Sequence, residues 1–283
     1  MEKSPVVLIT GCSTGIGFET SLILAREGYR VFATMRDLKR SSALRQAAQG
    51  LPLEIVPLDV DKARSVHKAV AVVRRMAGRI DILINNAGFG AFGALEEFTD
   101  EEILGQYQTN VFGLLTVTRE VLPLMRHQGS GRILHVGSLA GKMTFAGIGL
   151  YCSSKYSVEA IAESLRLEVR PFNIQVALVE PGVIETRFKS NRRKSQAFLQ
   201  GRSAYQSVMN RVFAWSNRRA EGAPVAEKVA VAILKALRVR RMAIRYSVGF
   251  DAVWYPVAKR FMPDSFYDQL MRWMYGRFQK GPA

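Results

Sequence analysis

Short apolar runs alternate along much of the chain with longer segments of helical periodicity. The runs are rich in Val, Ile and Leu with little polar alternation, which is typical of parallel strands buried on both faces. Strands are predicted over residues 6–10, 29–34, 53–57, 80–85, 132–136 and 175–179. Helices are predicted over residues 16–27, 61–76, 101–126, 153–170 and 225–237. This alternation predicts βαβ units with right-handed crossovers, and therefore an α/β fold with one doubly wound parallel sheet and helices on both faces.

Composition narrows the class of protein. Apolar residues make up 48% and charged residues 23% of the 283, which is typical of one globular domain and excludes disordered and collagen-like chains. No apolar run reaches the roughly 18–20 residues needed to cross a bilayer, and we expect no signal peptide before the first strand. Cys12 and Cys152 are the two cysteines, so we expect no disulfide framework and a cytoplasmic location.

The net charge of +16 is unevenly distributed, because residues 187–245 hold fifteen lysines and arginines but only two acids. Such a surface attracts anionic ligands, acidic lipids or nucleic acid, although it also fits a solvated face without a partner. No separate nucleic-acid-reading motif accompanies it, so no specific nucleic acid partner is predicted. The aromatic tail, residues 250–278, either packs on the domain, completes a neighbouring subunit's pocket, or makes a peripheral contact with an anionic membrane.

A glycine-rich loop, Thr10-Gly-Cys-Ser-Thr-Gly-Ile-Gly17, follows the first strand and begins the first helix. Glycines allow a tight turn and a close approach to a pyrophosphate, and the start of the helix offers free N–H groups. The residues predicted to bind phosphate are Gly11, Ser13, Thr14, Gly15, Ile16 and Gly17. A purely structural turn is the alternative for this loop.

The end of the second strand indicates which dinucleotide binds. Arg36 directly follows the apolar run, and a guanidinium suits the 2′-phosphate of NADP(H). Asp37 keeps NAD(H) as the competing cofactor, since an acid here would bond the ribose 2′-hydroxyl. Arg36 as a plain surface residue is the remaining alternative.

Four polar residues form the candidate catalytic group. Tyr151 and Lys155 share a helix face, and a nearby ammonium is expected to lower the pKa of the phenol toward working pH. Ser138 follows the strand 132–136, and its hydroxyl can hold a substrate oxygen. Asn110 interrupts the apolar face of its helix, and an ordered water leading to Lys155 would give its buried amide a partner.

These motifs, together with Asp59-Val60, Asn85-Asn-Ala-Gly88 and Pro181-Gly182 in the same order, closely resemble the short-chain dehydrogenase/reductase family over about residues 5–190. The resemblance implies a Rossmann-type sheet of about seven strands, and a catalytic tetrad of Asn110, Ser138, Tyr151 and Lys155. It implies further cofactor contacts by Asp59, Val60, Asn86, Ala87, Gly88, Tyr151, Lys155, Pro181, Gly182, Val183 and Thr186. It also implies a homodimer or homotetramer assembled through helices 101–126 and 153–170.

Within that family, Thr34-Met-Arg-Asp-Leu38 and Tyr151-Cys-Ser-Ser-Lys155 are most similar to the 17β-hydroxysteroid dehydrogenase and retinol dehydrogenase branch. That branch prefers NADP(H) through the arginine matching Arg36. Apolar residues are expected beside the tetrad: Phe89, Phe92, Leu139, Met143, Phe145, Leu150, Val183 and Ile184. They favour a bulky hydrophobic alcohol, ketone or aldehyde, such as a steroid, retinoid or lipid. The alternative is that several of them belong to the core.

We therefore expect an NADP(H)-dependent alcohol dehydrogenase or carbonyl reductase, with Tyr151 as general acid and base and with no metal site. A catalytically silent NADP(H)-binding sensor or scaffold of the same fold is the alternative. The expected organisation is a cofactor-binding and catalytic core over residues 5–186 and a substrate cap over residues 187–224. A last helix, a strand and a C-terminal extension would follow over residues 225–283.

Overall fold

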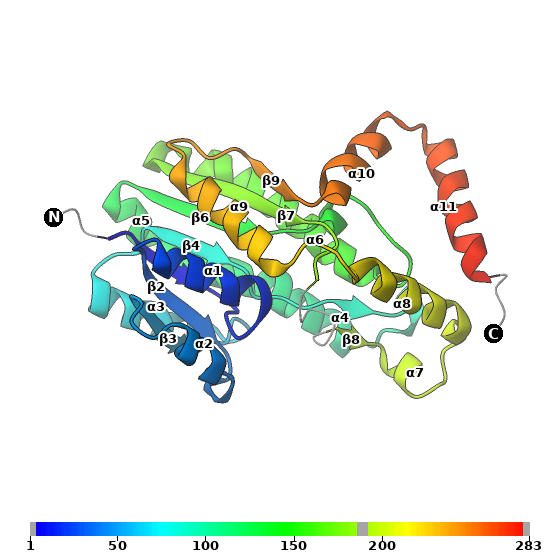
Figure 1. Ribbon diagram of the computed structural model, residues 1–283, viewed down its shortest axis with the longest axis horizontal. Helices are drawn as coiled ribbons and strands as arrows, with labels where there is room; N and C mark the ends of the chain where they lie inside the picture. The colour runs from blue at the N-terminus through cyan, green and yellow to red at the C-terminus, as the bar shows by residue number, and fades with distance from the viewer. Residues whose placement is uncertain (1–3, 186–191, 280–283) are drawn as a thin grey trace.

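The computed structural model describes residues 4–185 and 192–279. A seven-stranded parallel sheet runs through this part of the chain in the order β3-β2-β1-β4-β6-β7-β9 (Figure 1). The strands are β1 Val6–Ile9, β2 Arg30–Met35, β3 Leu53–Pro57, β4 Ile82–Asn85, β6 Gly131–Val136, β7 Ile174–Pro181 and β9 Arg245–Val248. The predicted doubly wound sheet is confirmed.

The strand order reverses beside β1. Val7 of β1 pairs with Val31 of β2 on one side and with Ile82 of β4 on the other. The connections that leave β1 and β4 run to opposite faces of the sheet, which opens a crevice beyond their carboxyl ends. This crevice is where an open parallel sheet binds its ligand.

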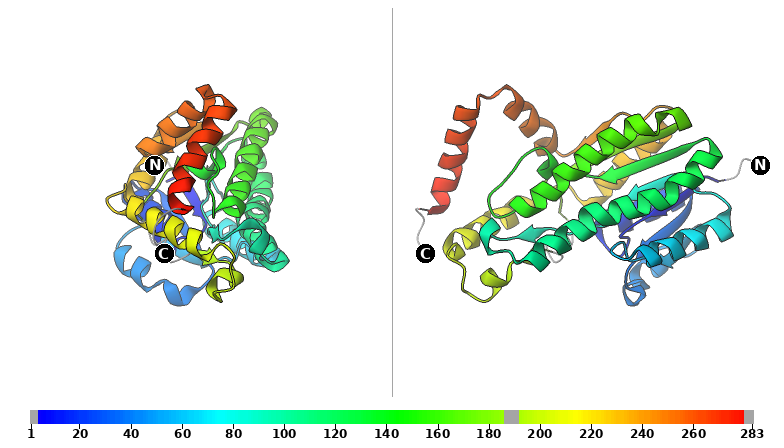
Figure 2. Two further views of the ribbon diagram at one scale, coloured as in Figure 1. Left: turned by 90° about the vertical axis from the view of Figure 1, so that its right-hand side faces the viewer. Right: turned by 180° about the vertical axis from the view of Figure 1, so that it is seen from behind.

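Helices cover both faces of the sheet (Figures 1 and 2). Leu8 and Ile9 of β1 are both fully buried, and because strand side chains alternate, each belongs to a different half of the core. On the Ile9 side lie α1 Gly15–Arg26, α2 Ser42–Ala47 and α9 Ala226–Arg238. On the Leu8 side lie α3 Ala63–Ala77, α5 Leu114–Gln128 and α6 Gly149–Glu168.

The helix predicted over residues 101–126 is one run of helical turns with a change of pitch. It consists of α4 Asp100–Tyr107, a π-helical segment Gln108–Gly113, and α5. Thr99 begins α4 with a capping box to Glu102, which fixes the start of the helix. A π-helical turn holds one extra residue and often marks a functional position. Asn110 lies within it, and apolar periodicity could not reveal it because one extra residue hardly changes the spacing.

The chain after β7 builds a layer beyond the carboxyl ends of the strands (Figure 2). Strand β8 Arg193–Lys194 pairs with β5 Ala91–Phe92. The helices of this region are α7 Gln196–Leu199, α8 Gln206–Ala220, α10 Phe250–Phe261 and α11 Asp264–Gln279. Tyr275 of α11 packs against the cluster of Phe198 and Phe213, and its hydroxyl accepts a 2.7 Å hydrogen bond from the Ala146 N–H. Tyr275 of the aromatic tail therefore packs on the domain, one of the expected arrangements, whereas Trp254, Phe261 and Trp273 are exposed.

No helix in the described ranges is long and apolar enough to cross a membrane. Cys12 and Cys152 are both buried and free.

The loops after β1 and β4 are held against each other by hydrogen bonds. The Thr10 hydroxyl accepts the N–H groups of Asn86 and Ala87, each at 3.0 Å. In return the Asn86 side-chain amide donates to the carbonyls of Thr10 at 2.8 Å and Gly11 at 3.0 Å. Gly11 has φ +74°, and a Cβ on it would lie 2.8 Å from the Ala87 Cα. Only glycine lets the two loops approach this closely.

We predict that Gly11→Ala destabilises the protein more than Gly28→Ala. Gly28 also has a positive φ, +82°, but no atom lies within 4 Å of the position its Cβ would take. Gly28→Ala should therefore lower the free energy of unfolding by only about 1–2 kcal/mol, the cost of a left-handed backbone at a residue that has a Cβ. Gly11→Ala should cost about 1–3 kcal/mol more through overpacking against Ala87. Urea unfolding of both variants measures the difference, and equal losses would contradict the close approach.

Candidate active site

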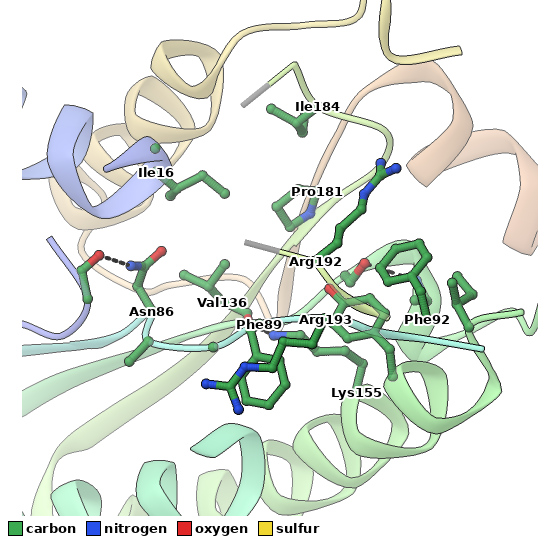
Figure 3. Close-up of a pocket in the computed structure, with 18 of the residues that line it drawn as sticks. Ile16, Asn86, Phe89, Phe92, Val136, Lys155, Pro181, Ile184, Arg192 and Arg193 are labelled. Atoms are coloured by element: carbon green, nitrogen blue, oxygen red, sulfur yellow. Dashed lines mark hydrogen bonds between the residues drawn. The ribbon is translucent and has the colours of Figure 1, made fainter. Parts of the chain in front are cut away.

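A cavity of about 740 Å³ occupies the crevice at the carboxyl ends of the strands (Figure 3). The loops after β1, β2, β3, β4, β6 and β7 form its inner wall, and α8, α10 and α11 close its outer end. Most of the predicted site residues line it: Gly11, Ser13, Thr14, Gly15, Ile16, Arg36, Asp59, Val60, Asn86, Ala87, Gly88, Ser138, Tyr151, Lys155, Pro181, Gly182 and Val183. Of the remaining three, Gly17 and Asn110 do not line it, and Thr186 lies outside the described residues.

The glycine-rich loop presents the start of α1 to the cavity. Thr14 precedes the helix in an extended conformation, and its side chain makes no capping hydrogen bond. The first N–H groups of α1 therefore remain available to a ligand, which is the usual way a helix binds phosphate. Gly17 contributes behind the loop, where a Cβ would lie 2.5 Å from the Asn86 side-chain nitrogen. Gly17 thus allows close packing rather than direct contact.

The turn after β2 carries Arg36, Asp37 and Arg40, which all line the cavity. Asp37 caps the short 3₁₀ helix η1 Leu38–Arg40 by accepting the Lys39 N–H at 2.9 Å. Its carboxylate thus already has a structural role, whereas Arg36 is exposed at the rim. The sequence reasoning missed Arg40, although its position four residues after Arg36 was a usable signal. The two guanidinium groups give this end of the cavity a positive character suited to a phosphate.

The loop after β7 is held by a residue that the sequence reasoning missed. Asp251, buried at the start of α10, accepts the Val183 N–H at 2.8 Å. A Cβ on Gly182 would lie 2.0 Å from the same carboxylate, so only glycine leaves room for it. The C-terminal extension therefore fixes the conformation of the predicted cofactor loop.

Ser138, Tyr151 and Lys155 meet at the middle of the cavity, as the sequence predicts. The Lys155 ammonium donates to the Val136 carbonyl at 2.7 Å and lies 5.9 Å from the centre of the Tyr151 ring. Ser138 accepts the Ala140 N–H at 3.1 Å, and its hydroxyl is hydrogen-bonded with the Tyr151 phenol. The arrangement places a phenol, a hydroxyl and an ammonium along one wall.

The pKa of Tyr151 is raised, not lowered as the sequence predicts. Burial raises the pKa of Tyr151 to about 12, and the hydrogen bond with Ser138 offsets only part of that rise. Burial also lowers the pKa of Lys155 to about 8, against the opposing charge of Glu159. The expected lowering of the phenol pKa is therefore not found, because desolvation dominates. At neutral pH Tyr151 carries its proton and can donate it to a carbonyl oxygen.

Asn110 does not line the cavity but bonds to segments that form its wall. Its side-chain amide donates to the Phe89 carbonyl at 3.0 Å and to the Ser154 hydroxyl at 3.1 Å, and it accepts the Phe89 N–H at 3.1 Å. Protein groups therefore satisfy the buried amide for which the sequence analysis invoked a water. Through these bonds Asn110 positions the Gly88–Phe89 segment against α6, the helix that carries Tyr151.

The outer half of the cavity is largely aromatic and aliphatic. Of the predicted apolar residues, six line the cavity: Phe89, Phe92, Leu139, Phe145, Val183 and Ile184. Met143 and Leu150 are buried but do not line it. Lys142, the charge nearest in sequence, does not enter the cavity because its ammonium pairs with the buried Glu180 carboxylate at 2.5 Å. The sequence reasoning missed Ile148, which precedes α6. It also missed the residues contributed by the cap and the tail: Arg192, Arg193, Val212, Trp215, Ser216, Arg219, Ala220, Tyr255 and Tyr275.

Comparisons with known proteins agree with this geometry. The short chain dehydrogenase family profile matches residues 5–197. Human 17-beta-hydroxysteroid dehydrogenase type 1 is 35% identical over 258 residues, which cover 85% of this chain and 76% of that protein.

Two solved structures extend the comparison. A short-chain dehydrogenase from Streptomyces avermitilis superposes with a TM-score of 0.83 at 30% identity, over 100% of both chains. A variant of actinorhodin polyketide ketoreductase with NADPH has a TM-score of 0.75 at 28% identity, over 89% of this chain and 98% of that one. The chain belongs to the short-chain dehydrogenase/reductase family of oxidoreductases.

Proposed function

We propose that this protein is an NADP(H)-dependent oxidoreductase that interconverts a hydroxyl and a carbonyl group on a bulky hydrophobic substrate. The observation that carries the proposal is one cavity that joins a glycine-rich loop, the Ser138–Tyr151–Lys155 group and an apolar outer wall. The steroid dehydrogenase and the NADPH-bound ketoreductase among its relatives support the reaction class. Steroid-, retinoid- and lipid-like carbonyl compounds are the expected substrates.

The residues at the inner end of the cavity have the chemistry needed to bind a dinucleotide. The uncapped start of α1 and the space kept open by Gly11 suit a pyrophosphate. Lys155 lines the same cavity and would bond to the nicotinamide ribose, as the family resemblance implies. When bound, the cofactor supplies a hydride in reduction or accepts one in oxidation.

The protein's own contribution is to hold the substrate oxygen and move a proton. Ser138 donates a hydrogen bond to the carbonyl oxygen, and Tyr151 transfers its phenol proton to that oxygen as the alcohol forms. The charge of Lys155 stabilises the phenolate left behind. Asn110 enters as a positioning residue through Phe89 and Ser154. The described part of the cap keeps water away from the reacting carbon.

We expect Tyr151→Phe to lower the turnover of lipophilic ketones and aldehydes by about 10²–10⁴-fold, because the general acid is removed. Binding of NADPH should persist, since the ring and Lys155 remain. Tyr156→Phe is the matched control, because Tyr156 is exposed on the same helix and does not line the cavity. NADPH oxidation measures turnover, and fluorescence titration measures cofactor binding.

Two outcomes of this experiment would count against the enzyme. If the Tyr151 and Tyr156 variants behave alike, Tyr151 is not the proton donor. If the wild-type protein binds NADPH but turns over nothing in a broad panel of lipophilic carbonyl compounds, the catalytically silent sensor is the better assignment.

Preference for NADP(H) over NAD(H) follows from the turn after β2. Arg36 and Arg40 line the cavity, while Asp37, the residue that favoured NAD(H), already caps η1. A 2′-phosphate would gain charge-assisted hydrogen bonds at this point, and a free ribose would not.

Arg36→Ala should raise the KM for NADPH about tenfold to a hundredfold, the equivalent of one charge-assisted hydrogen bond, and leave the KM for NADH nearly unchanged. Lys39→Ala is the control, since Lys39 belongs to the same turn but does not line the cavity. Steady-state kinetics with each cofactor give the comparison. An equal effect on both cofactors would show that Arg36 does not contact the distinguishing phosphate.

A peripheral membrane contact is supported by α10. Its most exposed apolar side chains follow a helical spacing and form one stripe: Phe250, Val253, Trp254, Val257 and Phe261. Aromatic rings with neighbouring cations suit the interface of a bilayer, and the net charge of +16 favours an anionic one. We propose that this stripe lies on an anionic membrane surface.

We predict that the protein floats with vesicles that contain phosphatidylglycerol and that Trp254→Glu with Phe261→Glu reduces the bound fraction several-fold. A matched control is Leu95→Glu with Leu199→Glu, which places the same two charges at exposed apolar positions outside α10. Flotation centrifugation measures the bound fraction. Equal flotation of the two variants would exclude the α10 stripe as the contact.

The homodimer or homotetramer implied by the family resemblance stays a prediction. Exposed apolar side chains on the expected contact surfaces support it: Leu104, Phe112 and Leu167.

A further inference from the structure

Helix α8 presents one face to the outer end of the cavity. The residues that line it recur at helical spacing: Val212, Trp215, Ser216, Arg219 and Ala220. Four of these are small, apolar or aromatic, as a hydrophobic substrate requires. Arg219 is the exception, because it places a permanent positive charge in the wall.

Contacts from two helices fix the Arg219 guanidinium. It donates to the Tyr255 hydroxyl of α10 at 2.9 Å. Its central carbon also lies 5.1 Å from the centre of the Trp215 ring and 5.4 Å from that of Tyr255. Cation–π contacts and one hydrogen bond therefore hold the side chain at the cavity wall. Most of its five N–H donors are not used by these contacts.

Besides Arg36 and Arg40, two further arginines line the same cavity, and in Figure 3 they leave the chain in opposite directions. Arg192 lies over the Phe92 ring at 4.8 Å and donates to the Asn217 side chain at 3.1 Å. Its Nε is buried and has no hydrogen-bond partner in the part of the chain that is described. Arg193 lies over the Phe89 ring at 3.9 Å. The outer cavity thus combines aromatic walls with several guanidinium groups.

In the described part of the chain, no carboxylate pairs with these groups. Across residues 4–185 and 192–279, none of the three arginines lies within 4.0 Å of an acidic oxygen. Asp251 also lines the cavity, but its two oxygens accept the N–H groups of Val183 and Ala252. A partly buried cation without an anionic partner is costly in free energy unless a ligand supplies the opposite charge.

Arg219 could instead serve only the fold, because a cation in the last turn of α8 interacts favourably with the helix dipole. Arg218 lies in the same turn and has the same dipole advantage, but it is exposed and does not line the cavity. The dipole explains a cation at either position. It does not explain why one guanidinium is stacked between aromatic rings at the cavity wall.

We propose that the outer end of this cavity binds an anionic group, such as a carboxylate, at the far end of an otherwise apolar carbonyl substrate. Arg219 is the principal ligand, and Arg192, whose guanidinium bonds to Asn217 of the same helix, contributes a second cation. The proposal rests on the function proposed above and narrows its substrate class. The cofactor's diphosphate is the other source of anion, because Tyr255 lies one turn of α10 after Asp251, which holds the loop after β7. The KM for NADPH in the experiment below distinguishes the two sources.

The test uses two pairs of ligands that differ only in the anion. The first pair is an ω-oxo fatty acid and the aldehyde of the same chain length, compared by kcat/KM with NADPH. The second is a fatty acid and the matching fatty alcohol, compared by calorimetric Kd, which does not depend on turnover. The wild-type protein should prefer the anionic member of each pair by about tenfold to a hundredfold, the equivalent of one charge-assisted hydrogen bond.

Arg219→Gln should reduce both preferences at least tenfold, whereas Arg218→Gln, the matched control, should leave them unchanged. The inference is overturned if the wild-type protein shows no preference in either pair, or if Arg218→Gln and Arg219→Gln lose it equally. It is also overturned if Arg219→Gln raises the KM for NADPH and keeps both preferences, since Arg219 would then serve the cofactor. Turnover of the neutral aldehyde without any acid preference leaves the proposed function intact. Selective fatty-acid binding without turnover of any carbonyl compound counts against that function but supports the anion site.

Discussion

The hydrogen bonds between Thr10 and Asn86 hold the loops after β1 and β4 together, and the geometry of the cavity depends on that contact. A doubly wound sheet leaves a crevice where its strand order reverses, but an unsupported crevice would be bordered by two independent loops. Here each loop donates to or accepts from the other through buried polar groups. Gly11 and Gly17 make the approach sterically feasible. The start of α1 and the segment 86–88 consequently form one continuous wall.

Burial controls the chemistry at the centre of the cavity. Lys155 is anchored to the Val136 carbonyl, and desolvation lowers its pKa while raising that of Tyr151. Both shifts have the same cause, because a low-dielectric wall disfavours charge on either group. The phenol is thereby kept protonated and ready to act as an acid. Under the proposed function, the glycine-rich loop would hold the cofactor and the largely apolar outer half would hold the substrate.

The sequence was sufficient where a residue's role follows from its local pattern. Buried parallel strands have an apolar signature, and Tyr151 and Lys155 share a helix face wherever that helix lies. The partners of Asn110 depend on a π-helical turn, whose single extra residue leaves no trace in apolar periodicity. Asp251 and Arg219 lie in the region where strand–helix alternation has ended, so their positions depend on tertiary packing. Long-range contacts of this kind cannot be read from spacing.

The contact between Asp251 and Val183 also sets the order in which the site is completed during synthesis. The ribosome releases the amino-terminal strands first, and their loops can pair before the chain is finished. The segment around Gly182 reaches its final conformation only after residue 251 has emerged and α10 has docked. A nascent or truncated chain that ends at β9 would contain every motif of the family and still lack a finished binding pocket. The pocket is thus finished only after α10 has been synthesised.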